Sequence, residues 1–163
     1  MSSESVRRYR LVQHGGPEVL ATEQATVAEP GPGQVRVRVE AMSLNHLDLW
    51  VRRGIPGVKF PLPMIPGSDG SGVVDAVGDG VETVSVGTPV FILPAVSCGH
   101  CRWCLAGQDN LCPSYAILGE GRDGTATQSC VLPAINVAPK PESLGFEQAA
   151  AFLLLRDARR APE

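Results

Sequence analysis

Cys98-Gly99-His100-Cys101-Arg102-Trp103-Cys104 is followed by Cys112, which places four cysteines within fifteen residues in the spacing C-x2-C-x2-C-x7-C. Two intervening residues allow neighbouring thiolates to face a common centre, and the longer gap returns the fourth from the far side of a loop. This arrangement suits tetrahedral zinc, with Zn–S distances of about 2.3 Å. Four thiolates leave no open coordination position, so the predicted zinc is structural and does not act as a Lewis acid.

Three other interpretations of these cysteines stay open. Disulfides are typical of small secreted domains, but the total of five cysteines is odd and no secretion signal precedes them. Cys112-Pro113 resembles the end of a ferredoxin run, although that run has three residues before its last cysteine and this chain has seven. The cysteines could also be reduced and unliganded. His100 is predicted to be solvated, and Cys130 is expected to be the one reactive thiol outside the cluster.

The composition is that of an ordinary globular protein. The 163 residues suffice for one domain with a core, and the net charge of −3 lacks the basic surplus typical of nucleic-acid binding. Eighteen glycines, 14 prolines and few aromatic residues indicate many turns between short strands, and therefore a mostly β fold with short helices. No signal peptide or membrane span is predicted, and reduced-looking cysteines favour a cytoplasmic protein.

Apolar and charged residues alternate over residues 35–41, which predicts a strand with one buried face. A helix is predicted over 45–53, with Asn45 as its N-cap, Gly54 beyond its last turn, and an apolar side made of Leu47, Trp50 and Val51. A second helix, rich in Ala and Leu, is predicted over 146–155 and runs into a charged tail over 156–163. The other predicted strands cover residues 6–13, 21–27, 73–77, 88–93, 125–132 and 135–137.

Two glycine-rich stretches could be functional. Residues 119–124 read G-x-G-x-x-G, but the sequence that follows favours a strand over a helix, so pyrophosphate binding is not predicted. Residues 67–72 (Gly-Ser-Asp-Gly-Ser-Gly) form either a flexible turn or a pocket wall where a ligand approaches the backbone. Asn45, His46 and Asp48 form a further polar cluster, although each alone is more often a cap or a solvated side chain.

Three separated motifs together resemble the N-terminal, GroES-like catalytic domain of the medium-chain dehydrogenases/reductases, the superfamily of zinc alcohol dehydrogenases and quinone oxidoreductases. The four-cysteine spacing is similar to that family's structural zinc lobe. Gly67, Gly72 and Gly78 match the frame of its signature G-H-E-x-x-G-x5-G. Residues 44–48, 65–70 and 115–120 look like a bacterial branch of zinc-binding alcohol dehydrogenases or quinone oxidoreductases. The resemblance covers about residues 6–152.

This resemblance implies a GroES-like, partly open β-barrel over residues 1–145, with a protruding four-cysteine zinc lobe over 97–113. Residues 146–163 then correspond to the start of the interdomain helix and a tail. The family's Rossmann cofactor domain follows that helix, so the chain is expected to be truncated and to have little or no dehydrogenase activity alone. NAD(P) is expected to bind only with the missing domain.

The resemblance also implies a reaction pocket. In zinc alcohol dehydrogenases the catalytic metal takes Cys at the position of Asn45 and His at that of Ser68, with Glu at that of Asp69. Asn and Ser are poor zinc ligands, so no catalytic zinc is expected, and Asn45 is what zinc-free quinone reductases of the superfamily carry. Asn45, Asp48, Ser68 and Asp69 are then expected to position an alcohol, aldehyde or quinone, and His46 to contact cofactor phosphates.

A second hypothesis is a stand-alone, zinc-stabilised module that binds a protein or a small molecule without catalysing a reaction. It predicts a monodisperse protein, and aggregation of the isolated chain through an exposed apolar patch, of which residues 152–155 would be a part, would contradict it. The sequence determines neither the substrate, nor the choice between NAD and NADP, nor the oligomeric state.

Overall fold

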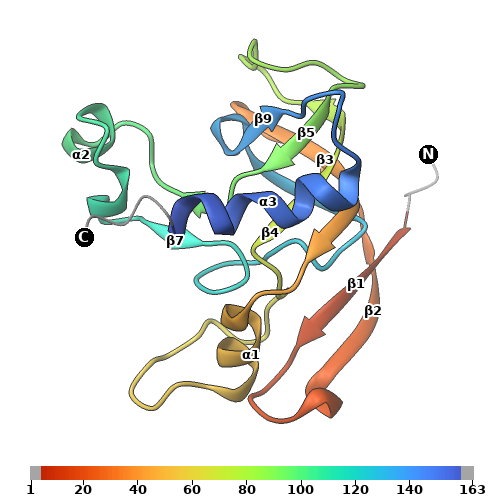
Figure 1. The fold of residues 1–163 in the computed structure, drawn as a ribbon, viewed down its shortest axis with the longest axis vertical. Coiled ribbons are helices and arrows are strands. Elements are labelled where there is room, and N and C mark those ends of the chain that lie inside the picture. The colour runs from red at the N-terminus through yellow and green to blue at the C-terminus, as the bar shows by residue number, and fades with distance from the viewer. Residues whose placement is uncertain (1–4, 159–163) are drawn as a thin grey trace.

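The computed structural model describes the backbone of residues 5–158 and the side chains of residues 5–152. Figure 1 shows a curled sheet with one long helix across it, a two-stranded ribbon on one side and a small lobe on the other. The predicted tail beyond residue 158, and the side chains of the predicted apolar patch beyond residue 152, lie outside the described parts of the chain.

The predicted class, mostly β with short helices, is confirmed. The strands are β1 (Ser5–Leu11), β2 (Leu20–Thr26), β3 (Gln34–Ser43), β4 (Asp69–Val77), β5 (Pro89–Ile92), β6 (Ala95–Val96), β7 (Ala116–Ile117), β8 (Ser129–Pro133) and β9 (Val137–Pro139). The helices are α1 (His46–Arg53), α2 (Arg102–Leu105) and α3 (Phe146–Ala158), with 3-10 turns η1 (Pro17–Val19), η2 (Asp109–Leu111) and η3 (Ala134–Asn136).

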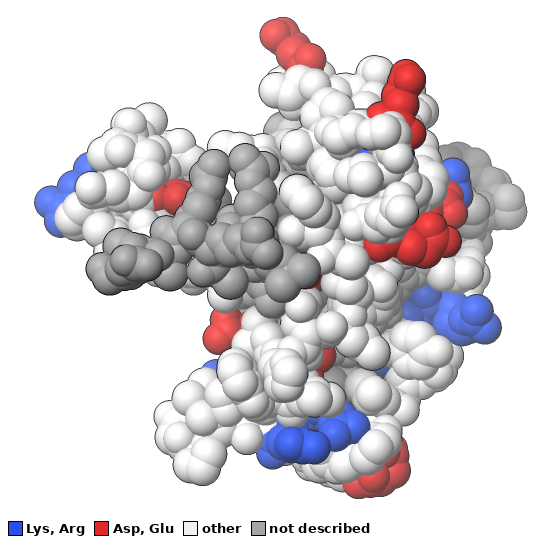
Figure 2. Space-filling model, in the orientation of Figure 1, with Lys and Arg blue, Asp and Glu red and all other residues white. Residues whose placement is uncertain are grey.

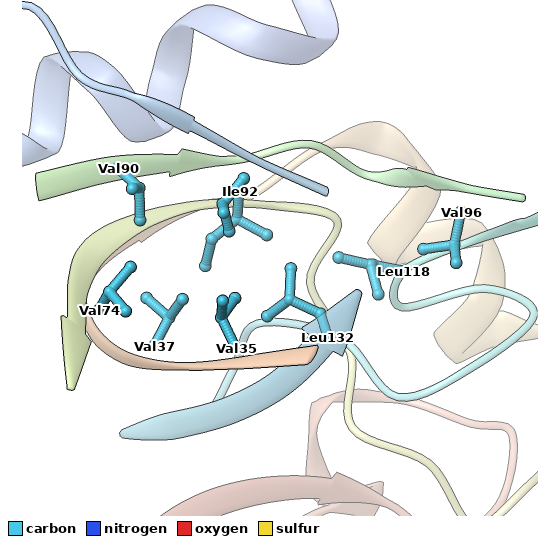
Figure 3. Packing of buried hydrophobic residues seen from close by; sticks show 9 residues of the cluster. Val35, Val37, Val74, Val90, Ile92, Val96, Leu118 and Leu132 are labelled. Atoms are coloured by element: carbon cyan, nitrogen blue, oxygen red, sulfur yellow. The ribbon is translucent and has the colours of Figure 1, made fainter. Parts of the chain in front are cut away.

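The main sheet has five antiparallel strands in the order β8-β3-β4-β5-β9, and it stays open between β8 and β9. Val35 and Val37, the buried positions of the alternating pattern in β3, point into the core formed inside the curl. Figure 3 shows them packed with Val74 of β4, Val90 and Ile92 of β5, and Leu132 of β8. Val96 and Leu118 extend this core toward the lobe, so β6 and β7 connect the two parts.

Two irregularities in the β3–β4 register allow the sheet to bend, one between Arg36 and Val37 and one between Val39 and Ala41. Strand β4 begins at Asp69, earlier than the predicted residue 73, so the stretch 67–72 is not a flexible turn. A Cβ on Gly72 would lie 2.1 Å from the carbonyl oxygen of Arg38. The pocket-wall interpretation is wrong at this glycine, because a neighbouring strand already occupies the space beside it.

Helix α3 lies across β3, β4 and β5. Ala149 and Ala150 are buried against the sheet, and Phe152 stacks on Phe91 with ring centroids 6.4 Å apart. The Ser71 hydroxyl donates to the carbonyl oxygen of Phe146 at 2.6 Å, which fixes the start of the helix on β4. The small side chains let the helix approach closely, which explains the Ala-rich pattern.

Several local predictions need correction. Trp50 is predicted on the apolar side of α1, but it is 53% exposed, because α1 contacts the neighbouring apolar cluster through Val51 and Leu47. Residues 134–136, of which the last two are predicted as strand, form the 3-10 turn η3, and β9 begins at Val137. Residues 125–128, also predicted as strand, lie before β8 and cross over the site described below.

Candidate functional site

The four predicted metal ligands meet in the lobe that carries α2 and η2. The sulfur atoms of Cys98, Cys101, Cys104 and Cys112 all lie within 4.8 Å of one another. The Sγ–Sγ distances from Cys104 are 3.8 Å to Cys98 and 3.5 Å to Cys101. A regular tetrahedron of four sulfurs with Zn–S of about 2.3 Å has S–S edges of about 3.8 Å, so this geometry fits zinc.

Backbone N–H groups donate hydrogen bonds to two of the sulfur atoms, as they commonly do to thiolates. Cys101 N donates to Cys98 Sγ at 3.3 Å, and Ser114 N donates to Cys112 Sγ at 3.4 Å. Hydrogen bonds from the backbone N–H groups of His100 and Cys101 lower the pKa of Cys98 to about 6. His100 is exposed and its Nδ1 lies 2.7 Å from the Cys98 carbonyl oxygen, so its side chain orients the loop from outside the sulfur cluster.

A second polar cluster forms where β3, α1 and β4 meet. Asn45 Nδ2 donates to Asp69 Oδ2 at 3.0 Å, and the Ser43 hydroxyl lies 3.4 Å from the same oxygen. The Ser43 hydroxyl also contacts the Ala150 carbonyl oxygen at 3.1 Å, which connects the cluster to α3. Asp69 is buried, whereas Asn45 and Ser43 are half-buried, so an outside molecule can reach the Asn45 amide but not the Asp69 carboxylate.

Asp48 joins the helix start to the segment before β4. Its Oδ2 accepts from Asn45 N at 2.7 Å and its Oδ1 accepts from Gly67 N at 3.0 Å, so both oxygens are used by the backbone. Burial raises the pKa of this carboxyl, and the two N–H donors act in the opposite direction. Asp48 therefore stabilises the backbone around Asn45 and Ser68, and both of its oxygens are already occupied.

Ser68 lies between these groups and is fully buried. Its hydroxyl oxygen has no hydrogen-bond partner among the residues that the structure describes. The predicted residues Asn45, Asp48, Ser68 and Asp69 are thus neighbours. His46, by contrast, is exposed, and its ring lies 6.2 Å, centroid to centroid, from the ring of the exposed Trp50.

The G-x-G-x-x-G stretch over residues 119–124, which is not predicted to bind a pyrophosphate, packs against the backbone of the site. No helix follows it before β8, and a Cβ on Gly119 would lie 2.6 Å from the backbone nitrogen of Gly67. The glycines therefore bring this loop against the backbone of the site.

Asn136 is a structural residue that the sequence does not reveal. It is buried, and its side-chain amide donates to the carbonyl oxygens of Leu93 at 3.1 Å and Ala95 at 2.6 Å. It connects η3 to the β5–β6 segment and so supports the base of the lobe. A single asparagine between two apolar residues gives no sequence signal for this role.

Cys130, which the sequence predicts to be the one reactive thiol, lies on β8 in surroundings that disfavour its thiolate form. Burial of the thiol on β8, reinforced by the nearby Asp75 carboxylate, raises its pKa to about 12. At pH 8 its thiolate fraction is roughly a thousandfold below that of an exposed cysteine with a pKa of about 8.5. We therefore expect Ellman's reagent to label Cys130 slowly in the zinc-loaded folded protein, and all five cysteines after unfolding with a chelator. One thiol labelled within seconds in the Cys130-containing protein, and lost in a C130S variant, would contradict this.

Among the described residues, no helix is both long and apolar enough to cross a membrane. Figure 2 shows acidic and basic side chains in small separate groups on the visible face. This distribution agrees with the near-neutral net charge.

Comparison with known proteins gives one consistent result. Residues 31–142 match the alcohol dehydrogenase GroES-like domain. An alcohol dehydrogenase of Schizosaccharomyces pombe is 35% identical over 141 residues, which cover 86% of this chain and 40% of that protein. A crystal structure of an NAD-dependent alcohol dehydrogenase is 57% identical with a TM-score of 0.85, over 91% of this chain and 43% of that one.

A third relative is a cobalt- and zinc-bound thermostable alcohol dehydrogenase from Pyrobaculum aerophilum. It is 35% identical with a TM-score of 0.80, over 91% of this chain and 45% of that one. The chain thus spans about two fifths of the length of the relatives that it matches.

Proposed function

This chain belongs to the family of alcohol dehydrogenase GroES-like domains, and from that membership we propose that it is the substrate-binding part of an NAD(P)-dependent oxidoreductase. The substrates would be alcohols, aldehydes or quinones. The proposal is carried by the Asn45–Asp69 pair at the meeting point of β3, α1 and β4, where Asp69 is buried and Asn45 is half-buried.

Asn45 is the residue we propose to touch the substrate oxygen. One of its two amide hydrogens is directed at Asp69 Oδ2, which leaves the second for a carbonyl or quinone oxygen. A donor fixed in this way stabilises negative charge that develops on the oxygen as hydride arrives at carbon. A nicotinamide, when bound, supplies that hydride. Asp69, Ser68 and Asp48 are buried and would orient Asn45.

We propose that this pocket works without a catalytic zinc. An amide and a hydroxyl are poor zinc donors, and the Asn45 amide is directed to Asp69. The four lobe cysteines would hold one structural zinc, because their sulfur geometry suits a closed tetrahedral site. We further propose that residues 1–145 form the GroES-like domain and that residues 146–163 begin the connection to a cofactor domain.

The cofactor would be held mainly outside these residues. Within residues 5–158 no strand, glycine turn and helix follow one another as a dinucleotide unit requires, and His46 alone is too little for one. We therefore expect no NAD(P)H oxidation by the 163-residue chain alone. Because reduced thiols suit a reducing compartment, we place the protein in the cytoplasm.

A domain exchange tests this function. The corresponding segment of the 57% identical NAD-dependent alcohol dehydrogenase is replaced by this chain, and NADH oxidation is followed with a panel of aldehydes, ketones and quinones. We expect turnover with at least one class. N45A should lower kcat/KM roughly 100-fold, the usual effect of losing one oxyanion donor. N110A, at an exposed asparagine of the lobe, should leave the rate unchanged. A folded hybrid that binds NADH and oxidises it with no member of the panel would contradict the proposal.

A further inference from the structure

Two chain segments far apart in sequence lie side by side at the candidate site. The backbone from Ile65 to Asp69 leads into β4, and residues 123–126 follow it closely. Ile65 N donates to Asp123 Oδ1 at 2.8 Å, and Gly124 N returns a hydrogen bond to the Ile65 carbonyl oxygen at 2.7 Å. Ala126 N donates to the Pro66 carbonyl oxygen at 2.9 Å. The two segments therefore form a continuous ladder outside the regular sheet.

Thr125 makes two hydrogen bonds that enclose Ser68. Its backbone N–H donates to the carbonyl oxygen of Gly67 at 2.9 Å, and its hydroxyl donates to the carbonyl oxygen of Asp69 at 2.8 Å. The residue is 1% exposed, so water does not compete for either bond. One buried threonine thus fixes the carbonyl groups of the two residues that flank Ser68.

Glycines on both segments make this approach possible. A Cβ on Gly67 would lie 2.7 Å from the Thr125 hydroxyl oxygen, and one on Gly124 would lie 2.0 Å from the Gly67 carbonyl oxygen. Gly67 also has a φ of +97°, a conformation that other residues rarely adopt. The glycines of the two motifs thus provide the space that Thr125 needs.

We propose that Thr125 is a positioning residue: its hydroxyl fixes the Asp69 peptide so that the Asp69 carboxylate holds Asn45 in place. The role of Asn45 toward substrate rests on the proposed function, whereas the Thr125–Asp69–Asn45 linkage stands on its own. Asp48 holds the same segment through a hydrogen bond from Gly67 N. Thr125 and Asp48 would therefore both act on the Ser68 segment.

The test uses the 163-residue chain and a matched pair of variants. T125V removes the hydroxyl that reaches Asp69. T127V removes another buried hydroxyl from the same segment, whose bond goes to the Ser129 carbonyl oxygen at 3.0 Å, away from the site. Solvent exchange of the Asn45 side-chain amide is measured by NMR. We expect about tenfold faster exchange at the Asn45 amide in T125V, the effect of one weakened hydrogen bond, no change there in T127V, and wild-type exchange in T125S.

Wild-type exchange at Asn45 in a folded T125V, or equal changes in T125V and T127V, would overturn the proposal, since Thr125 would then only stabilise the fold. If T125V does not fold, T125A removes the same hydroxyl without placing a methyl group beside the Asp69 carbonyl, and the same two outcomes apply. An inactive domain-exchange hybrid would contradict the proposed function and leave these exchange rates unaffected, so the two failures are distinguishable.

Discussion

Replacing Cys112 with serine is expected to lower the zinc content of the purified protein from about one ion per chain to near zero after dialysis against a chelator. Cys112 is the most buried of the four ligands, and two backbone N–H groups already point at its sulfur. Binding free energies of structural zinc reach about 10–16 kcal/mol in small domains, so loss of one thiolate has a large effect.

The effect should be confined to the lobe. Helix α2 has four residues and η2 three, too few to be stable alone, and Leu105 and Leu111 of the lobe are exposed instead of forming a core. Amide hydrogen exchange should therefore lose protection over residues 98–112 while β3 and β4 keep theirs. The matched control is C130S, which should retain zinc. A C112S protein that still holds one zinc ion per chain would show that the four sulfurs do not form one site.

The second large effect is expected from Gly124→Ala. The added methyl group would lie 2.0 Å from the Gly67 carbonyl oxygen and 2.7 Å from that of Pro66, and both are backbone atoms that cannot rotate away. The two segments would have to separate, which breaks the ladder beside Ser68. We expect the free energy of unfolding to fall by about 3 kcal/mol or more, measured by urea denaturation.

The control for this variant is Gly121→Ala, in the same G-x-G-x-x-G stretch. The added Cβ would lie 3.1 Å from its closest neighbour, the Cβ of Ala116. The free energy of unfolding should therefore fall by less than about 1 kcal/mol. If both variants lost the same stability, the glycines would be acting through backbone flexibility and not through the close approach that the structure shows. The pair therefore separates packing from conformational freedom.

Local rules made several elements predictable. The N-cap Asn45 and the glycine after α1 indicated its bounds, because helix termini depend on a few neighbouring residues. Alternation over 35–41 indicated β3 and its buried valines, since side chains alternate across a strand. The side on which Trp50 lies could not be predicted, because it depends on which face of α1 meets the rest of the protein.

The cysteine spacing alone determined the candidate metal ligands, because C-x2-C-x2-C-x7-C brings four sulfurs together through local loop geometry. Only the tertiary structure decided what Thr125, Cys130 and the glycines over 119–124 do. Thr125 donates a hydrogen bond to a segment 56 residues away. The pKa of the Cys130 thiol is raised by burial and by Asp75, and not by its neighbours in sequence. Hydrogen bonding and desolvation at a site depend on which distant segments fold against it, and no local pattern records that choice.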